Sequence, residues 1–193
     1  MEAIRQGAAK GLEEVGERFQ RLEAFLPELM MAGEAMRACL EVLLPVISAE
    51  RKGAFDLGRV VIGTVSGDIH DIGKNMVASI LRINGFEVYD IGIDVSVKRF
   101  IEKAEEVKAK IIALSALLTT SANYQREVIR YLKDAGLREK YYIAVGGAPT
   151  NEVWAAEIGA DAYAKDAFGA SQVLKKLVVE GVPPPLPRPL VII

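Results

Sequence analysis

The fold of this chain is decided by residues 59–91, RVVIGTVSGDIHDIGKNMVASILRINGFEVYDI. The two ends of this stretch, 59–65 and 87–91, contain short β-branched runs and predict strands. Between them, 74–84 has the apolar spacing of a helix, and a loop rich in glycine and aspartate, 66–73, joins this helix to the first strand. A strand, a helix and a second strand in this order predict one unit of a parallel sheet.

The same alternation continues through the rest of the chain. Further strands are predicted at 111–115, 142–145 and 161–163, and further helices near 97–109, 123–135, 151–158 and 167–179. Each crossover helix must pack back onto the sheet, so both faces of the sheet are covered. The sequence therefore predicts an α/β domain of the flavodoxin-like (Rossmann-like) kind, with a five-stranded parallel sheet in the order 2-1-3-4-5.

The first 50 residues have a different pattern. Apolar residues recur at helical spacing and predict two amphipathic helices, divided near Pro27, which suits the first turn of a helix. Five of the eight prolines lie in 181–193, so the end of the chain is expected to run as an extended arm. We expect four parts: a helical cap at 1–50, a linker at 51–58, the α/β domain at 59–181 and a proline-rich tail at 182–193.

Composition excludes several classes of protein. Hydrophobic residues make up 51% and charged residues 26% of the chain, and the net charge is −2, so nucleic acid is not expected as a partner. No apolar run approaches the ~20 residues of a membrane span, and we expect a cytoplasmic protein. Cys39 is the single cysteine, which excludes an internal disulfide and, with one histidine, a four-ligand zinc site.

The one histidine, His70, lies in the loop after the first predicted strand. In the expected strand order, the chain leaves strands 1 and 3 toward opposite faces, and ligands bind in the crevice beyond their carboxyl ends. The loops at that crevice are 66–73 and 116–121. A lone loop histidine is often only a solvent-exposed or hydrogen-bonded residue, and composition alone leaves that alternative open.

A phosphate-binding loop is the first function to test for a glycine-rich segment of this kind. Five residues separate Gly67 from Gly73, and Asn75 follows Lys74, so the spacing and the hydroxyl of a P-loop are both absent. Aspartates in the loop would also repel phosphate. An acidic pocket in which Asp68 and Asp71 hold a magnesium ion stays open as an alternative.

Asp68 and His70 together indicate a different chemistry. Residues two apart on an extended segment point to the same side, so the carboxylate can hydrogen-bond one ring nitrogen while the other nitrogen faces outward. This arrangement makes His70 a suitable axial ligand for a transition metal. Other protein ligands are lacking, so the metal would arrive in a macrocycle, and both haem and corrin satisfy this requirement.

Three motifs resemble those of a known family. GDIHDIGKN contains Asp68, His70 and Gly73 as DxHxxG, which resembles the corrinoid-binding motif of methionine synthase, the B12-dependent mutases and the corrinoid proteins of methyltransferase systems. SALLTTS (115–121) and GGA (146–148) resemble the second and third motifs of the family. Residues 15–36 resemble the helical cap of its methyl-transferring branch, although the 50 residues before the linker are expected to supply fewer than the four helices of a usual cap.

The resemblance implies a bound cobalamin or another cobamide. It makes His70 the lower axial ligand of cobalt, with Asp68 bonded to His70 and Ser121 bonded to Asp68. The displaced nucleotide tail of the cofactor would occupy a slot for which the candidates are Gly73, Ser115, Leu117, Thr119, Gly146, Gly147 and Ala148. In the cap, one or two of Phe19, Phe25, Leu26 and Met30 would contact the corrin.

The implied function is to carry a methyl group on cobalt. The expected partners are a substrate-specific methyltransferase, an acceptor methyltransferase that uses tetrahydrofolate or coenzyme M, and a reductive activase, with self-association left open. Alone, the chain is expected to turn over little. A corrinoid-sensing or storage module and the small subunit of a B12-dependent mutase remain alternatives.

Overall fold

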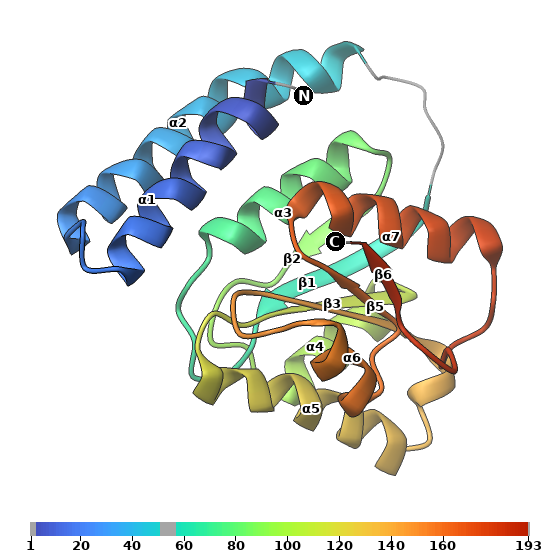
Figure 1. Ribbon diagram of the computed structural model, residues 1–193. Helices are drawn as coiled ribbons and strands as arrows, with labels where there is room; N and C mark the ends of the chain where they lie inside the picture. Colours follow the sequence, from blue (N-terminus) through green and yellow to red (C-terminus); the bar gives the residue numbers. More distant parts are fainter. Residues whose placement is uncertain (1–2, 51–56, 193) are drawn as a thin grey trace. The chain divides into compact units, whose positions relative to one another are not determined.

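The computed structural model describes residues 3–50 and 57–192 (Figure 1). The chain forms two compact units, Met1–Gly53 and Ala54–Ile193, and each is described here by itself. Most of the expected linker, 51–56, lies outside the described residues. No helix in the described ranges is long and apolar enough to cross a lipid bilayer.

The first unit is helical, as predicted. It contains a short π-helical segment, η1 (Ala3–Ala9), followed by α1 (Lys10–Gln20) and α2 (Leu26–Glu50), and α1 packs against α2 in a hairpin (Figure 1). Pro27 lies in the first turn of α2, where its missing N–H costs no hydrogen bond. The backbone N–H of Phe25 donates to the Glu28 carboxylate at 2.7 Å, which satisfies a donor at this helix start.

The second unit is built on a parallel sheet. Its strands are β1 (Arg59–Thr64), β2 (Glu87–Asp90), β3 (Ile111–Ser115), β4 (Tyr142–Gly146), β5 (Ala162–Ala164) and β6 (Leu190–Ile192). Their order is β2-β1-β3-β4-β5-β6, and every neighbouring pair is parallel. The predicted order of the first five strands is confirmed, and the carboxyl ends of β1 and β3 lie beside each other at the point where the chain changes direction.

The sixth strand corrects the expectation that the tail is only an extended arm. Leu190 donates its N–H to the carbonyl of Asp161 at 2.8 Å, and Lys165 donates to the carbonyl of Ile192 at 3.2 Å. Proline lacks an N–H and cannot donate to a ladder, so the strand starts only after the last proline, Pro189. The tail therefore covers the edge of β5, which would otherwise present unpaired backbone groups.

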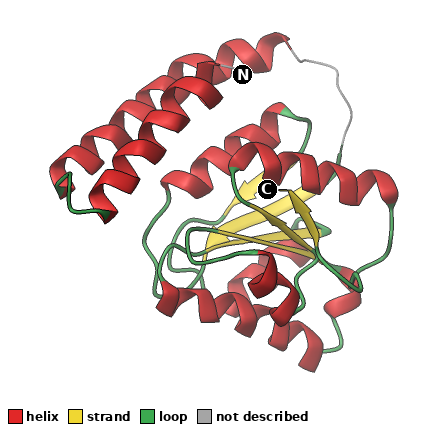
Figure 2. Ribbon diagram, in the orientation of Figure 1, coloured by secondary structure: helices red, strands yellow, loops and turns green. Residues whose placement is uncertain are grey.

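Helices cover both faces of this sheet (Figure 2). One face carries α3 (Ile72–Ile83) and α7 (Ala167–Glu180), and the other carries α4 (Val97–Glu106), α5 (Thr119–Asp134) and α6 (Glu152–Ile158). A short 3₁₀ segment, η2 (Arg138–Lys140), precedes β4. Neighbouring residues of β1 face opposite sides: Val60 lies in the core beneath α3 and α7, whereas Val61 lies in the core beneath the other helices.

Candidate functional site

The loop after β1 is held by the loop after β2. Gly67 has a positive φ of 75°, and its N–H donates to the Asp94 carboxylate at 2.7 Å. The N–H of Asp94 donates in turn to the backbone carbonyl of Asp68 at 3.0 Å. These bonds fix the turn that carries the chain from the end of β1 to His70.

Asp68 is a buried carboxylate at the centre of the site. One of its oxygens, Oδ1, accepts from the backbone N–H of His70 at 3.0 Å and lies 2.7 Å from the ring Nδ1 of the same residue. The other, Oδ2, accepts from the Ser121 hydroxyl at 2.6 Å and from the N–H groups of Leu117 and Leu118 at 2.7 and 3.3 Å. One carboxylate thus joins the loop after β1 to the loop after β3.

The environment of Asp68 stabilises its charged form. Burial raises the pKa of this carboxyl, but the hydrogen bonds that it accepts, first of all from the Ser121 hydroxyl and the Leu117 N–H, outweigh that effect and hold the pKa well below its usual value. An ionised carboxylate can only accept, so Nδ1 of the His70 ring carries the proton of their shared hydrogen bond.

His70 presents its other ring nitrogen to the outside. The side chain is 47% exposed although its partner carboxylate is buried, and no group among the described residues bonds Nε2. The backbone is fixed on both sides of the ring, because the buried Thr64 hydroxyl donates to the His70 carbonyl at 2.8 Å. A neutral imidazole with Nδ1 held and Nε2 free is the form that binds a metal through Nε2.

Ser121 is positioned by the start of α5. This helix begins at Thr119, four residues before the predicted start, because the Leu118 N–H is bonded by Ser121 Oγ at 3.3 Å in the first turn. The same hydroxyl is buried and faces Asp68. Thr119 is exposed in that first turn, two residues from Ser121.

The slot candidates all lie at the carboxyl edge of the sheet. Gly73 is in the first turn of α3 with free space where a Cβ would project. Ser115 and Gly146 are the last residues of β3 and β4, and the other candidates follow these strands, with Thr119 at the start of α5. Gly147 has a φ of 118°, and a Cβ at this position would lie 1.7 Å from the carbonyl oxygen of Ala116. The loops after β3 and β4 therefore approach so closely that only glycine is accommodated there.

Large apolar side chains are exposed in the loops at this edge. Ile69 is 71% exposed beside His70, and Ile93, Leu117 and Leu118, which follow β2 and β3, are also exposed. Apolar side chains gathered at the ends of three neighbouring strands are typical of a surface that is covered by a ligand.

Three residues that contribute to the site were missed by the sequence reasoning. Thr64 and Asp94 hold the loop, and Lys74 is a lysine whose side chain is only 2% exposed. Its ammonium lies 2.5 Å from the Asp90 carboxylate and donates to Asn75 Oδ1 at 2.6 Å. The sequence does place Lys74 directly after Gly73 of the motif, and this was the available signal. Nothing in the spacing of the surrounding residues predicts that the side chain of Lys74 is buried.

The magnesium alternative is not supported. Both oxygens of Asp68 are occupied by hydrogen-bond donors, and the Asp71 carboxylate accepts from Asn75 Nδ2 at 2.9 Å. Within the described ranges, no group of three or more Asp, Glu, His or Cys side chains could hold a metal ion. A single axial histidine does not need such a group when the remaining ligands belong to the cofactor.

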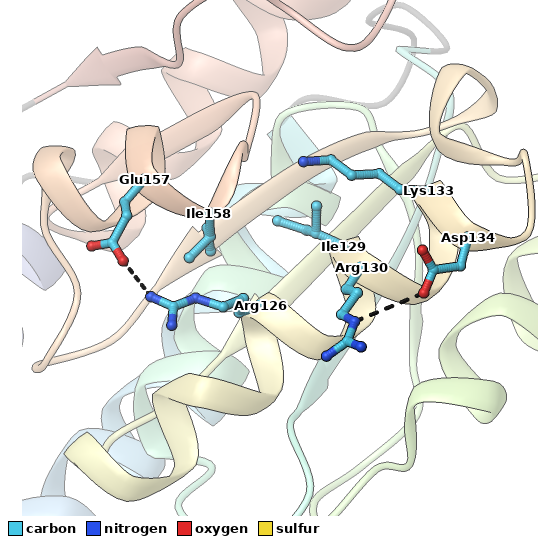
Figure 3. A pocket seen from close by; sticks show the side chains of 7 residues that line it. All are labelled: Arg126, Ile129, Arg130, Lys133, Asp134, Glu157 and Ile158. Atoms are coloured by element: carbon cyan, nitrogen blue, oxygen red, sulfur yellow. Dashed lines mark hydrogen bonds and ion pairs between the residues drawn. The ribbon is translucent and has the colours of Figure 1, made fainter.

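A separate hollow of about 250 Å³ lies between α5 and α6 (Figure 3). Two of its arginines face carboxylates, Arg126 with Glu157 at 2.5 Å and Arg130 with Asp134 at 3.8 Å. The residues that line it come from the later turns of α5 and from the end of α6, away from the first turn of α5 that holds Ser121. It is therefore distinct from the edge that carries His70.

The fold and the site together define a class: a flavodoxin-like domain with an exposed imidazole and exposed apolar side chains at its switch point. Residues 58–171 match the family model described as B12 binding domain, and residues 1–44 match a second model with the same description. The chain belongs to this B12-binding family, as the motifs had indicated, and it binds a cobamide.

Similar proteins are known from methanogenic archaea. Dimethylamine corrinoid protein 1 of Methanosarcina mazei is 49% identical over 181 residues, which is 92% of this chain and 82% of the relative. Trimethylamine corrinoid protein 1 of Methanosarcina acetivorans is 48% identical over 86% of this chain and 77% of its own length.

Two solved structures are also similar. The Methanosarcina barkeri monomethylamine corrinoid protein matches with a TM-score of 0.83 and 37% identity over 91% of this chain and 82% of its own. A chain of the Methanosarcina barkeri methanol:cobalamin methyltransferase complex MtaBC matches with a TM-score of 0.61 and 28% identity, over 92% of this chain and 67% of its own.

The residues of the site fit a cobamide. The free Nε2 of His70 suits an axial ligand, the exposed apolar side chains suit the face of a macrocycle, and the unfilled space beside Gly73 suits a part of the cofactor that enters between the loops.

Proposed function

We propose that this chain carries a methyl group on the cobalt of its cobamide between two methyltransferases. The donor side is a substrate-specific methyltransferase for a methylated amine, and the acceptor side uses tetrahydrofolate or coenzyme M. The amine is proposed because the similar proteins are named dimethylamine, trimethylamine and monomethylamine corrinoid proteins.

The single observation that carries this proposal is the placement of His70. Its Nδ1 is bound to a buried, ionised carboxylate, and its Nε2 is left for the cobalt. We therefore assign His70 as the lower axial ligand, with the lower base of the cobamide displaced. Asp68 holds the ring in the correct tautomer, and Ser121 holds Asp68.

The bound cobamide supplies a cobalt ion that alternately accepts and releases the methyl group. The chain supplies control of the axial bond. A proton on Nδ1 is shared with Asp68, and Asp68 also accepts from Ser121, so these three groups would hold or take up a proton beside the ring that would bind the cobalt.

The carrier role requires partner proteins. We propose that separate methyltransferases approach this edge, and that a reductive activase restores inactive cobalt. The similar chain of the methanol:cobalamin methyltransferase complex supports the expectation of a methyltransferase partner.

The test is reconstitution with hydroxocobalamin, followed by removal of free cofactor and by visible and EPR spectra of the Co(II) form. We expect one bound corrinoid with nitrogen hyperfine coupling from His70, and loss of that coupling in His70→Ala. Methyl transfer from dimethylamine in the presence of a methylamine methyltransferase would then establish the carrier role. Retention of corrinoid without any methyl transfer would favour a storage or sensing module, and no retention would refute the proposal.

A further inference from the structure

Gln125 is a polar side chain on α5 that is completely buried (0% exposed) and that the corrinoid motifs do not include. Its Nε2 donates to two backbone carbonyls, those of Leu114 and Gly146, each at 3.1 Å. Leu114 is the next-to-last residue of β3, and Gly146 is the last residue of β4. One amide group therefore ties together the carboxyl ends of two neighbouring strands.

Trp154 determines the orientation of this amide. The indole Nε1 on α6 donates to Gln125 Oε1 at 3.0 Å. An indole N–H can only donate, so the amide oxygen must face Trp154 and both amide hydrogens must face the strands. Arg126 lies over the indole ring at 4.6 Å, which holds the indole in place. Arg126 itself pairs with Glu157 at 2.5 Å (Figure 3).

The strands that Gln125 joins lead directly into the slot candidates. Ser115, Leu117 and Thr119 follow on one side, and Gly147 and Ala148 follow on the other. Beyond the ends of β3 and β4, regular backbone hydrogen bonds no longer fix the separation of the two loops that follow these strands. Gly146 O accepts from the Ala116 N–H at 3.1 Å as well as from Gln125, so the amide reinforces the last link between the loops.

We propose that Gln125 is a positioning residue for the nucleotide slot: it fixes the separation of the loops after β3 and β4, and so gives the chain its preference for a complete cobamide over a corrinoid that lacks the nucleotide tail. The inference rests on the proposed function, because it requires the tail to enter between these loops. Gln125 does not touch the cofactor. It acts through the backbone of Leu114 and Gly146.

The test compares the dissociation constants of hydroxocobalamin and of diaquocobinamide, which lacks the nucleotide and lower base, by equilibrium dialysis with the full chain. In Gln125→Met, which keeps the length of the side chain but removes both donors, we expect cobalamin affinity to fall about tenfold. Cobinamide affinity should change by less than about twofold. The ratio of the two constants is the readout, because a purely structural role would weaken both ligands equally.

The matched control is Gln172→Met, at an exposed position of α7, which should leave both constants unchanged. Trp154→Phe removes the donor that orients the amide, together with one ring of the indole that packs on the core. It should change the ratio in the same direction by about threefold, which keeps the proposal testable if Gln125→Met does not fold. An unchanged ratio in both variants, or equal loss for both ligands, would overturn the role of Gln125 while the wild-type protein still binds cobalamin. If the wild-type protein binds neither ligand, the proposed function itself fails.

Discussion

The Ser121 hydroxyl lies 2.6 Å from the Asp68 carboxylate, although the two residues are 53 positions apart in the sequence. Asp68 follows β1 and Ser121 opens α5 after β3, so this bond crosses the switch point of the sheet. It connects the residue that orients His70 to a helix on the other side of the crevice. The geometry of the histidine therefore depends on the correct placement of two loops.

Replacing Ser121 by alanine should destabilise the protein. Asp68 would lose its shortest hydrogen bond while it stays buried, and we expect the free energy of unfolding to fall by ~2 kcal/mol. Urea denaturation of the cofactor-free protein measures this loss. Ser171→Ala, at another buried serine, is the control and should cost less than ~1 kcal/mol; equal losses would show that the bond to Asp68 contributes nothing special.

The stability of the cofactor-free protein should decrease in acid because of Asp68. Its pKa is lowered on folding, so its contribution is fully present above the unfolded pKa of about 4 and is lost as the pH falls toward the folded-state value. Denaturation at a series of pH values from about 6 down to 3 measures the slope. Asp68→Asn should be less stable near neutral pH and should have a shallower slope; parallel curves would contradict the assignment.

Gly147→Ala should be severely destabilising. The new Cβ would lie 1.7 Å from the Ala116 carbonyl oxygen, and the positive φ adds backbone strain, so a loss of more than ~3 kcal/mol is expected. Gly136→Ala separates the two causes, because Gly136 also has a positive φ but has free space around it. The control should lose only about 1 kcal/mol, and similar thermal midpoints for the two variants would refute the steric explanation.

Lys74→Met should weaken the attachment of α3 to the end of β2. The buried ammonium is bonded to the Asp90 carboxylate and to Asn75, and its removal leaves Asp90 without its cation, at a cost of ~2 kcal/mol. Lys98→Met is the control, since the pair of Lys98 with Glu102 is exposed, and its effect should stay within ~0.5 kcal/mol. A double-mutant cycle of Lys74→Met with Asp90→Asn should show that the two residues are coupled. Additive losses of unfolding free energy in the double variant would exclude such coupling.

The sequence by itself determined the class of the fold and the location of the site. The spacing of apolar residues in strands and in helices can be recognised within short windows of sequence. Because the alternation of strands and helices leaves few possible topologies, the order of β2, β1, β3, β4 and β5 was predicted correctly. His70 could be placed at the switch point for the same reason, and the DxHxxG motif led to the cobamide. The expected start of α5 was late by four residues, because a cap depends on side-chain bonds that spacing does not show.

Only the tertiary structure decided which distant groups support that site. Thr64, Lys74, Asp94 and Gln125 carry no local signal of their partners, because each bonds a residue or a backbone group that the chain brings close only after folding. The sixth strand is a similar case, since three apolar residues after a run of prolines form a strand only where the edge of β5 offers hydrogen-bond partners. Local spacing fixes elements, whereas buried polar groups are fixed by whichever partners the packed fold places within reach.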